Sequence, residues 1–566
     1  MAIQTFNFLQ FLGGLQTATS PFLINDNELS MLDNCQISYK YGAITKRLGY
    51  YKIGDTLVAN KSITGLHNFR QTASTQKILA TINNSAGTNL TLKYFTNVSS
   101  TVTTSSASGQ KVVSTTTTTG YIVGDSVIIG KGTATEETKV IDTIQAGVSI
   151  TLTQNLTYTQ AIGKTIEQTW TDINVSTTYN AFEDCVTEME DFIGYCFIVG
   201  YDSTDGVFLP KGTLTGTTFS TTDRCTNMPQ GKYIKRYRDR LYVANCYITA
   251  TAYPYRVYYS SVPTAGDISW TVATDFIDVD YSESITGLGE NWDRLVVFTN
   301  YSAYQYNQSE KKKVWDVGCS NHRTIKNSGA YMIWANRDGV WQSTSGRPEN
   351  IAGRVIDFIK AGTPSNFFAE VVDEEYYLYV GTVTVNGITF TNTRIVYNIP
   401  TKTWRIEELY NNITAMTAYN NSGSLQLYTG STTGMVWAQS KYTDSTRYYA
   451  DAYVDVNDTG QPIHSWFETK AFDLGSPQIS KDVVSVIAYA DRAMGLFLKA
   501  RVVDNNTRSI TEYKEIGQLK KYINENMKVN PEKGNFLQFE GTEMGKNPYW
   551  SFFGLSVGIL VDEIKK

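Results

Sequence analysis

The feature of this sequence that most restricts its fold is the regular return of turn-forming residues. From about residue 50 onward, clusters of Gly, Asn, Asp and Ser separate short apolar or alternating segments roughly every ten residues. A helical pattern appears only near residues 354–360, apart from a short helical turn expected from Asn27 to Asn34, where an Asn can cap the turn and two leucines lie three apart. The spacing therefore predicts an all-β fold.

Composition and length agree with strands and with more than one structural unit. Tyr alone supplies 38 residues and aromatic residues 13% of the chain, and together with frequent Thr and Val they suit half-buried pleated surfaces better than helices. A chain of 566 residues exceeds what one hydrophobic core usually organises. We expect two or three domains, or one large repeated domain.

Most of the chain consists of modules that resemble one another in plan. Segments such as 233–244, 256–260 and 276–279, then 285–288, 294–298 and 302–306, read as blocks of three or four strands. Modules of about 40 to 50 residues, each too small to bury both faces, are what a β-propeller stacks around an axis. We predict a propeller over residues 51–100 and 169–440, with six blades.

Three further regions complete the expected organisation. Residues 101–168 are rich in Thr, Ser, Ile and Val with Gly at the bends, which predicts a small β-barrel inserted into the first blade, where insertions cost little free energy. Residues 1–50 read as an extended N-terminal arm, because Gly pairs and a Pro interrupt any long helix. Residues 441–566 alternate in polarity and predict a platform-like β-domain that packs with this arm.

Charge and targeting signals exclude several classes of function. The formal net charge is only −5, and the longest run of positive charge is Lys311 to Lys313, so nothing indicates binding to nucleic acid through phosphate neutralisation. The first residues lack the pattern of a secretory signal, and the longest apolar stretch, near residues 549–561, is too short to span a bilayer. We expect a soluble chain that is not exported.

The residues that most often hold metals or cofactors are sparse. The three histidines, His67, His322 and His464, lie far apart without ligand spacing, so we expect no metal site and no Ser-His-Asp triad. No phosphate-binding or dinucleotide-binding glycine motif is present, and no cofactor is expected. The six cysteines have no Cys-x-x-Cys spacing and are expected to be reduced and buried: Cys35, Cys185, Cys196, Cys225, Cys246 and Cys319.

Paired carboxylates are the remaining candidates for catalysis. A glycosidase needs two of them facing a sugar, about 5 to 10 Å apart. Two acidic groups could supply such a pair, but each is interpreted as a charged turn next to a strand: Glu188, Glu190 and Asp191, and Asp373, Glu374 and Glu375. No catalytic residue is predicted.

Aromatic and basic residues suggest contacts between sheets or between subunits. Six tyrosines could stack on sugars or bases but are expected to pack between adjacent blades: Tyr253, Tyr255, Tyr258, Tyr259, Tyr304 and Tyr306. The three lysines 311–313 fit either a solvated turn or a phosphate contact. Arg236, Arg238 and Arg240 alternate along one expected strand face and, with Lys46 and Arg47, are candidates for a subunit interface.

Three signatures in this order resemble the tail nozzle, or tail tubular, proteins of short-tailed bacteriophages and related tail hubs. The first is Gly13-Gly14-Leu15 followed by residues 42–49, which end in Lys-Arg-x-Gly. The second comprises residues 240–244, 256–261, 285–288 and 294–298, and the third comprises 337–340, 396–404 and 469–481. Each piece is common in β proteins, but together they span most of the chain.

The resemblance implies a structural virion protein rather than an enzyme. Its propeller and platform would form a homo-oligomeric ring, sixfold in symmetry, that extends the tail channel and passes genomic DNA without sequence-specific contacts during ejection. The expected partners are other tail ring or adaptor proteins and tail fibres, with contact to the host envelope. The protein would be located in the virion after assembly in the host cytoplasm. Because strong phosphate contacts would stall sliding DNA, the channel is expected to be neutral or acidic.

Two other functions remain open from the sequence. The propeller could bind a receptor or cleave polysaccharide at the tail tip, with exposed loops or the 101–168 insertion contacting the host. A bacterial adhesin-like surface protein is a further alternative, against which the missing export signal argues.

Overall fold

The computed structural model describes residues 3–38, 42–72, 76–83, 90–175, 185–202, 212–215, 218–220, 224–249, 251–421, 423–440, 450–451, 460–491, 495–504, 509–519, 525–527, 533–545 and 550–561. Within these residues the regular helices are one α-helix, α1 (Ile356–Ala361), and two single 3₁₀ turns, η1 (His322–Thr324) and η2 (Pro364–Asn366). All other regular structure is strand. The prediction of an all-β chain is confirmed, and α1 lies where the sequence indicated a helix.

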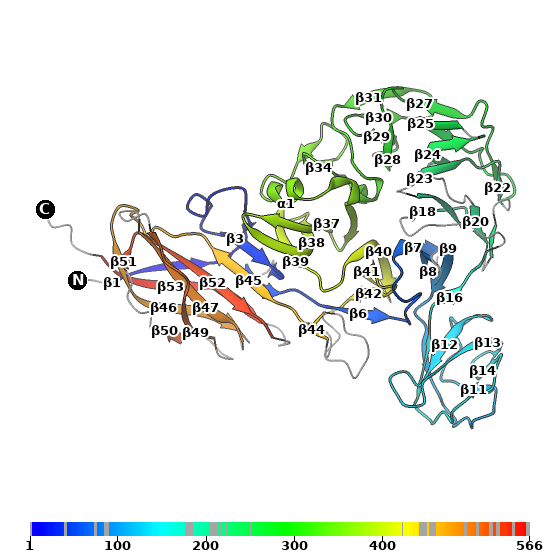
Figure 1. Ribbon diagram of the computed structural model, residues 1–566, viewed down its shortest axis with the longest axis horizontal. Helices are drawn as coiled ribbons and strands as arrows, with labels where there is room; N and C mark the ends of the chain where they lie inside the picture. Colours follow the sequence, from blue (N-terminus) through cyan, green and yellow to red (C-terminus); the bar gives the residue numbers. More distant parts are fainter. Residues whose placement is uncertain are drawn as a thin grey trace.

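Seven small, mainly antiparallel sheets follow one another around a common axis, as in a β-propeller (Figure 1). The innermost strand of each sheet, or the segment leading into it, lines one central cavity. The strands of sheets one to three are β7 (Ile63–Arg70), β8 (Gln76–Asn83), β9 (Leu90–Phe95) and β16 (Thr171–Asp172); β18 (Cys185–Phe192), β19 (Tyr195–Asp202), β20 (Gly212–Thr215), β21 (Thr218–Ser220) and β17 (Asn174–Val175); and β23 (Gln230–Tyr237), β24 (Arg240–Ile248), β25 (Thr251–Tyr259) and β27 (Phe276–Asp278).

Sheets four to seven continue the same plan. Their strands are β28 (Ile285–Glu290), β29 (Leu295–Thr299), β30 (Ala303–Tyr306) and β31 (Lys311–Trp315); β32 (Lys326–Ser328), β33 (Tyr331–Asn336), β34 (Gly339–Ser343) and β35 (Glu349–Asn350); β36 (Phe368–Val372), β37 (Glu375–Val385), β38 (Ile388–Asn398) and β39 (Thr403–Glu408); and β40 (Ile413–Asn421), β41 (Ser424–Ser431), β42 (Val436–Gln439) and β6 (Tyr50–Ile53). The short pair β22 (Cys225–Thr226) and β26 (Ile268–Ser269) flanks the third sheet.

The ring is closed by a strand from the N-terminal side. Strand β6 precedes the first sheet in the sequence but pairs with β42 as the outer strand of the seventh sheet, with Ile53 opposite Val436. On the inner side, the Asn68 amide donates to the carbonyl of Ala418 at 2.9 Å and links the first and seventh sheets. Seven sheets among the described residues correct the expected six blades. The modules diverge so far in sequence that the irregular second sheet and the split seventh sheet do not stand out as repeats.

Neighbouring sheets pack through apolar and aromatic side chains. Tyr258 points into the core between sheets two and three, while the adjacent Tyr259 points into the core between sheets three and four, where it meets Tyr306. This alternation follows from the period of two along a strand. The prediction of packing between blades is confirmed for Tyr255, Tyr258, Tyr259, Tyr304 and Tyr306, whereas Tyr253 belongs to neither core.

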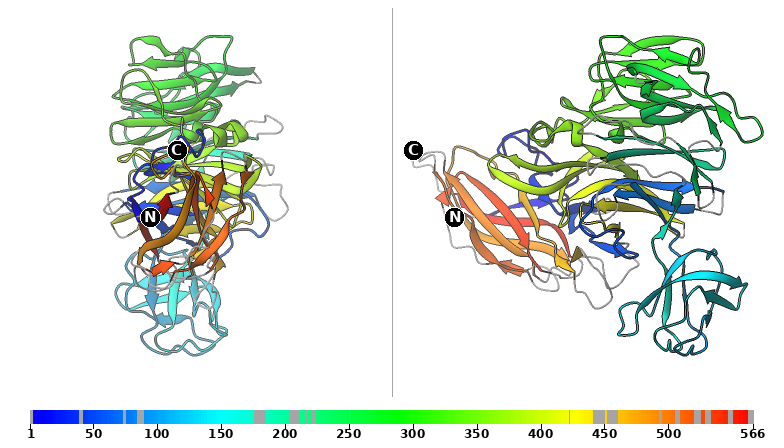
Figure 2. Two further views of the ribbon diagram at one scale, coloured as in Figure 1. Left: turned by 90° about the vertical axis from the view of Figure 1, so that its left-hand side faces the viewer. Right: turned by 45° about the vertical axis from the view of Figure 1, so that its right-hand side comes forward.

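A separate six-stranded sheet interrupts the first blade between β9 and β16 and extends away from the other sheets (Figure 2). Its strands are β10 (Ser99–Thr101), β11 (Val112–Ser114), β12 (Ser126–Ile129), β13 (Glu137–Gln145), β14 (Ser149–Leu152) and β15 (Thr165–Gln168). A bridge between Val102 and Thr115 connects its two edge strands, so the sheet closes on a core of its own. The Tyr94 hydroxyl donates to Asp125 at 2.7 Å and ties the insertion to the first sheet.

The two ends of the chain together build a second β unit beside the propeller, here called the platform (Figure 1). One of its sheets contains β1 (Ile3–Leu9), β4 (Cys35–Ser38), β5 (Ala43–Lys46), β46 (Lys481–Asp491), β50 (Glu525–Met527), β51 (Lys533–Gly534) and β53 (Ser551–Val561). The other contains β2 (Gly14–Leu15), β3 (Glu28–Asp33), β45 (Ser465–Thr469), β47 (Phe497–Asp504), β48 (Ser509–Ile510), β49 (Lys514–Gln518) and β52 (Phe536–Glu543). The pair β43 (Ala450–Asp451) and β44 (Gln461–Pro462) lies between propeller and platform in the sequence.

The second platform sheet continues into the propeller. Strand β3 lies beside β39 of the sixth sheet, with Asp33 opposite Ile406, so the two sheets form one eleven-stranded sheet. The expected helical turn from Asn27 to Asn34 is therefore wrong. Leu29 and Leu32 are both buried, and strand pairing on both sides of β3 outweighs the local capping preference.

Candidate functional site

The central cavity of the propeller is lined by seven charged side chains as well as by apolar ones. Its volume is about 340 Å³, and its walls come from β7, β18, β23, β28, β36 and β40 and from the segment 322–327 that contains η1. Four glutamates, Glu188, Glu190, Glu290 and Glu370, face three cations, Lys235, Arg323 and Lys326. The site is thus a mixed-charge chamber on the propeller axis.

Most of these charges are paired across neighbouring sheets. The Lys235 ammonium lies 3.0 Å from the Glu190 carboxylate and joins the third sheet to the second. The Lys326 ammonium lies 3.0 Å from Glu370 and joins the fifth sheet to the sixth. Such pairs hold the inner strands in register with one another and leave the paired carboxylates little freedom for acid–base work.

Arg323 lies at the centre of this arrangement. Asn321 caps the η1 turn by accepting the Arg323 backbone N–H at 2.9 Å, and the turn directs the Arg323 side chain across the cavity. The guanidinium donates to Glu188 at 2.9 Å and to the backbone carbonyls of Thr64 at 2.6 Å, Thr187 at 3.1 Å and Thr414 at 3.4 Å. One side chain therefore bridges the first, second and seventh sheets. Nothing in the sequence signalled this role, because an isolated Arg after a His matches no motif.

His322 faces the same cavity as a neutral hydrogen-bond acceptor. Its Nδ1 accepts the Leu288 backbone N–H at 3.1 Å, and its Nε2 lies 4.0 Å from the Glu188 carboxylate. Burial lowers the pKa of His322 to about 4, although the charge of Glu188 acts in the opposite direction. The imidazole is consequently uncharged at neutral pH and serves as a fixed part of the wall.

The structure separates the two predicted acidic groups. Glu188, Glu190 and Asp191 lie within strand β18, so the prediction of a turn at these residues is wrong: pairing with β19 continues to the hairpin at Ile193 and Gly194. Asp373 and Glu374 do form the predicted turn, with left-handed backbone angles. Glu375 starts β37 and pairs with Arg405, away from the central cavity.

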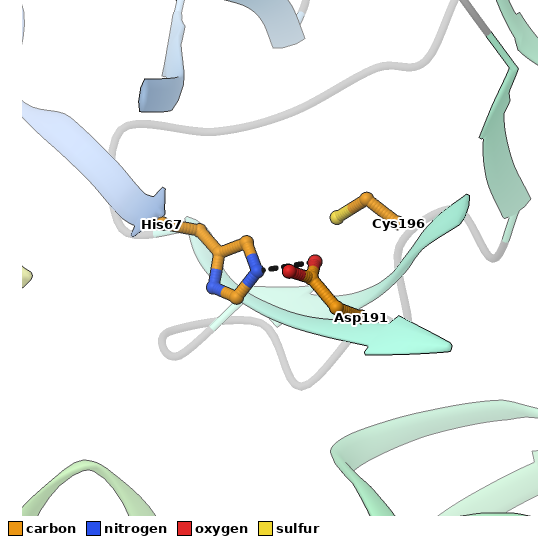
Figure 3. A group of neighbouring side chains, drawn as sticks. All are labelled: His67, Asp191 and Cys196. Atoms are coloured by element: carbon orange, nitrogen blue, oxygen red, sulfur yellow. Dashed lines mark hydrogen bonds and ion pairs between the residues drawn. The ribbon is translucent and has the colours of Figure 1, made fainter. Parts of the chain in front are cut away.

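A second cluster, formed by His67, Asp191 and Cys196, lies at the seam between the first and second sheets (Figure 3). Of its members, His67 also lines the central cavity. His67 Nε2 is 2.7 Å from an oxygen of Asp191, and one ligand atom from each of His67, Asp191 and Cys196 lies within 4.8 Å of the others. Burial alone would lower the pKa of His67, but the Asp191 carboxylate outweighs it and holds the pKa above its ordinary value. Burial raises the pKa of the Cys196 thiol, and Asp191 adds to the rise.

The cluster is poorly arranged for nucleophilic catalysis. A catalytic cysteine needs a base in contact with it and a lowered pKa. Here the His67 ring contacts Asp191, and the Cys196 thiol is fully buried with a raised pKa. The three groups do offer nitrogen, oxygen and sulfur donors in one place, which the wide sequence spacing of the histidines had argued against.

The five residues predicted at a subunit interface all make contacts within this chain. The hairpin between β23 and β24 turns at Arg238, so Arg236, Arg238 and Arg240 do not share one strand face, and that part of the prediction is wrong. Arg236 lies over the Phe192 ring, Arg238 is paired with Asp293, and Arg240 donates to the Ser260 carbonyl at 2.6 Å.

Lys46 and Arg47 lie inside the chain rather than on its surface. The Lys46 ammonium is 2.6 Å from Glu543 of β52, and both side chains are fully buried. Arg47 donates to both oxygens of Asp451 at 2.8 and 2.5 Å and to Asn34 at 2.6 Å. The two residues have no exposed surface with which to contact a neighbouring subunit.

Arg47 belongs to a buried network of charges at the junction between propeller and platform. Glu407 of β39 is bonded to Arg394 at 3.0 Å and to Arg405 at 3.0 Å. Burial alone would raise the pKa of Glu407, but the charges of Arg394, Arg405 and Arg47 lower it to about 2. The junction is thus fixed by charge as well as by the shared sheet.

Comparison with known proteins gives structural likenesses at low sequence identity. No family model and no curated protein matches the chain. Two crystal structures of an exo-β-1,3-galactanase from Phanerochaete chrysosporium align over 66% of this chain and 95% of theirs, with 7% identity and a TM-score of 0.22. The structure of Chaetomium thermophilum Sqt1 bound to the N-terminus of a ribosomal protein aligns over 70% of this chain and 99% of that chain, with 7% identity and a TM-score of 0.29. Likenesses at this level carry no argument about activity.

Proposed function

We propose that this chain is a structural subunit of a bacteriophage tail, where identical copies close into a nozzle or hub ring that passes DNA during ejection. The sequence signatures described above support this function. The structural observation that carries it is the junction, where β3 of the platform lies beside β39 of the propeller and Arg47, Asp451 and Glu407 form a buried network. A subunit whose two parts are joined in this way can transmit load between the rings above and below it.

The propeller axis itself is unsuited to serve as the DNA channel. Arg323 crosses the central cavity and bonds three of the seven sheets, and the remaining space of about 340 Å³ is far smaller than a duplex requires. DNA would therefore pass through the opening that the ring of subunits encloses, along the axis of that ring. Because sliding DNA is slowed by phosphate contacts, the subunit faces that line this passage would be neutral or acidic.

The absence of catalysis is part of the proposal. In the central cavity, the Glu188 and Glu190 carboxylates are engaged by Arg323 and Lys235 from other sheets. A glycosidase would need one of two facing carboxyls free to donate a proton. The geometry favours a role for these residues in holding the sheets together.

Electron microscopy of the purified chain tests this function. We expect closed rings of sixfold symmetry in which the platform contributes to the contacts between copies. Reconstructions of the tail should place the same ring around the DNA path. A chain that stays monomeric at high concentration and has no annular position in the virion would contradict the proposal.

A second candidate function rests on a groove between the fourth and fifth sheets, which shares Glu290 and Asn327 with the wall of the central cavity. This groove, with a volume of about 220 Å³, is lined by Glu290 and by the aromatic rings of Trp292 and Tyr331, and 64% of Trp292 is exposed. Exposed aromatic rings beside a carboxylate suit contact with a sugar. Binding of host polysaccharide that Trp292→Ala abolishes would favour a receptor-binding propeller at the tail tip.

A further inference from the structure

We propose that His67, Asp191 and Cys196 form a zinc-binding site at the seam between the first and second sheets of the propeller. The three residues come from three strands, β7, β18 and β19, and their ligand atoms lie within 4.8 Å of one another. Zn²⁺ is a divalent ion that accepts imidazole nitrogen, carboxylate oxygen and thiolate sulfur together. This inference is independent of the proposed tail function.

The backbone fixes two of the three ligands relative to each other. Asp191 and Cys196 are direct partners in the antiparallel pair of β18 and β19, five residues apart across a hairpin that turns at Ile193 and Gly194. Both hairpin residues have left-handed backbone angles, which match the twist of a tight two-residue turn. Partners of this kind project to the same face of the sheet with their Cβ atoms about 5 Å apart. Their side chains therefore converge on the seam where His67 of β7 lies.

The distances require only small movements for metal binding. Ligand atoms on one tetrahedral zinc ion lie about 3.3 to 3.6 Å from each other, given bond lengths of about 2.0 to 2.3 Å. The His67–Asp191 distance of 2.7 Å would lengthen slightly, and the widest separation, at most 4.8 Å, would shorten by roughly 1 Å. The metal would replace the direct hydrogen bond between imidazole and carboxylate.

The surroundings orient the carboxylate and leave room for a fourth ligand. The backbone N–H of Arg70 donates to the second oxygen of Asp191 at 2.8 Å, which directs the first oxygen to His67. Such a second contact holds a metal ligand in place. The side chains of His67 and Asp191 are 22% and 29% exposed, so water can reach the site and complete a four-coordinate ion.

Binding would join two adjacent sheets of the propeller through one ion. His67 belongs to the first sheet, whereas Asp191 and Cys196 belong to the second. The Cys196 thiol loses its proton to solvent as the zinc–sulfur bond forms, and a protonated His67 does the same, so affinity should fall as the pH is lowered. Because the folded chain presents the three ligands together and an unfolded chain does not, zinc should raise the melting temperature.

Cobalt spectroscopy of the full chain tests this site directly. After chelator treatment under reducing conditions, Co²⁺ should bind with one equivalent and give the near-ultraviolet absorption of a thiolate–cobalt bond, and Zn²⁺ should displace it. Cys196→Ser should abolish this absorption and weaken zinc binding by more than roughly 100-fold, the upper limit for loss of a mere outer-shell group. The matched control is Cys246→Ser, since Cys246 is also buried and free but lies in the third sheet.

Each outcome of this experiment decides the proposal. Circular dichroism of the metal-free variants establishes that Cys196→Ser is folded, and His67→Gln provides a second variant that should also lose the zinc-dependent rise in melting temperature. A cobalt spectrum without thiolate absorption, or zinc binding that both variants retain, would overturn the assignment. Absorption that disappears equally in Cys246→Ser would do so as well, because the ligand would then lie elsewhere.

Discussion

At the scale of single residues, the propeller depends on side chains that reach across its axis. Arg323 is the clearest example, since its guanidinium bonds the Glu188 carboxylate and three backbone carbonyls from three different sheets. Backbone carbonyls at inner strands need donors when water is largely excluded, and one arginine supplies several. The inner ends of these sheets are therefore held by one long polar residue as well as by apolar contacts.

Replacing Arg323 should destabilise the fold strongly. Arg323→Gln leaves the Glu188 charge without its partner in a largely buried cavity, a loss that typically costs about 3 to 5 kcal/mol. Urea denaturation measures the change in the free energy of unfolding. The control is Arg337→Gln, because 71% of the Arg337 side chain is exposed and its loss should cost less than about 0.5 kcal/mol. Equal effects of the two substitutions would contradict the bridging role.

The lowered pKa of His322 predicts how the stability of the fold depends on pH. Its pKa is lowered to about 4 in the folded chain and is near 6.5 when unfolded, so the folded state resists protonation. The resulting stability is complete above pH 6.5 and is lost as the pH falls towards 4, up to about 3 kcal/mol. Melting temperatures between pH 7.5 and 4.5 should fall less steeply in His322→Gln than in the native chain. The exposed His464 provides the comparison, and a His464→Gln variant with the same flattened profile would refute this attribution.

At the scale of elements, the ring closes where a strand from before the first sheet completes the last one. The turn after β41 holds the chain that leaves β6, since the backbone N–H of Leu57 donates to the Gly434 carbonyl at 2.8 Å. Gly434 has a φ of +77°, and a Cβ at this position would lie 1.9 Å from the Val58 carbonyl oxygen. The closure thus requires glycine for two separate reasons.

Substitution of Gly434 should weaken the closure of the propeller by β6 and β42. Gly434→Ala introduces both a strained backbone angle and a steric conflict, and we expect a loss of more than about 2 kcal/mol in the free energy of unfolding. Hydrogen exchange should show the largest loss of protection in β6 and β42. Gly346→Ala serves as control, because that Cβ would meet open space and should change stability little. Unchanged protection of β6 in Gly434→Ala would argue against this closure.

The strands were predictable from local pattern, whereas their partners were not. The hairpin of Arg337 and Asp338 and the alternating tyrosines 258 and 259 follow from turn chemistry and from the period of two, and the structure contains both. The prediction around Leu29 was wrong because β45, the strand that pairs with β3, lies far away in the sequence. The roles of Arg323 and Cys196 could not be predicted for the same reason, since each depends on neighbours from other sheets.

At the scale of the whole molecule, propeller and platform are joined through buried charge as well as through strands. Lys46 pairs with Glu543 inside the platform, while Arg47, the next residue, pairs with Asp451 and lies beside Glu407 of the propeller. Removal of one member of a buried pair usually costs far more than the pair contributes relative to apolar residues. We therefore expect the strands and ion pairs of the junction to lose their structure together.

The two parts should lose structure together when heated. In the native chain, we expect hydrogen exchange in β38 of the propeller and in β52 of the platform to rise at the same temperature. Arg47→Gln should separate the two transitions by leaving Asp451 unpaired. The control is Lys470→Gln, since the Asp26 partner of Lys470 is 70% exposed and contributes little. Separate transitions already present in the native chain would show that the junction does not couple the two parts.

The meeting of the two chain ends in the platform has a consequence for biosynthesis. Strand β1 pairs with β53 along its whole length, so residues 3–9 must wait during synthesis for residues 551–561. The propeller can close once β42 has been made, whereas the platform is completed only after β53 has been made. A nascent chain would therefore carry a finished propeller but no finished platform. If the platform makes the contacts between copies, then assembly cannot begin before β53 has been made, and chains that lack it are kept out of the ring.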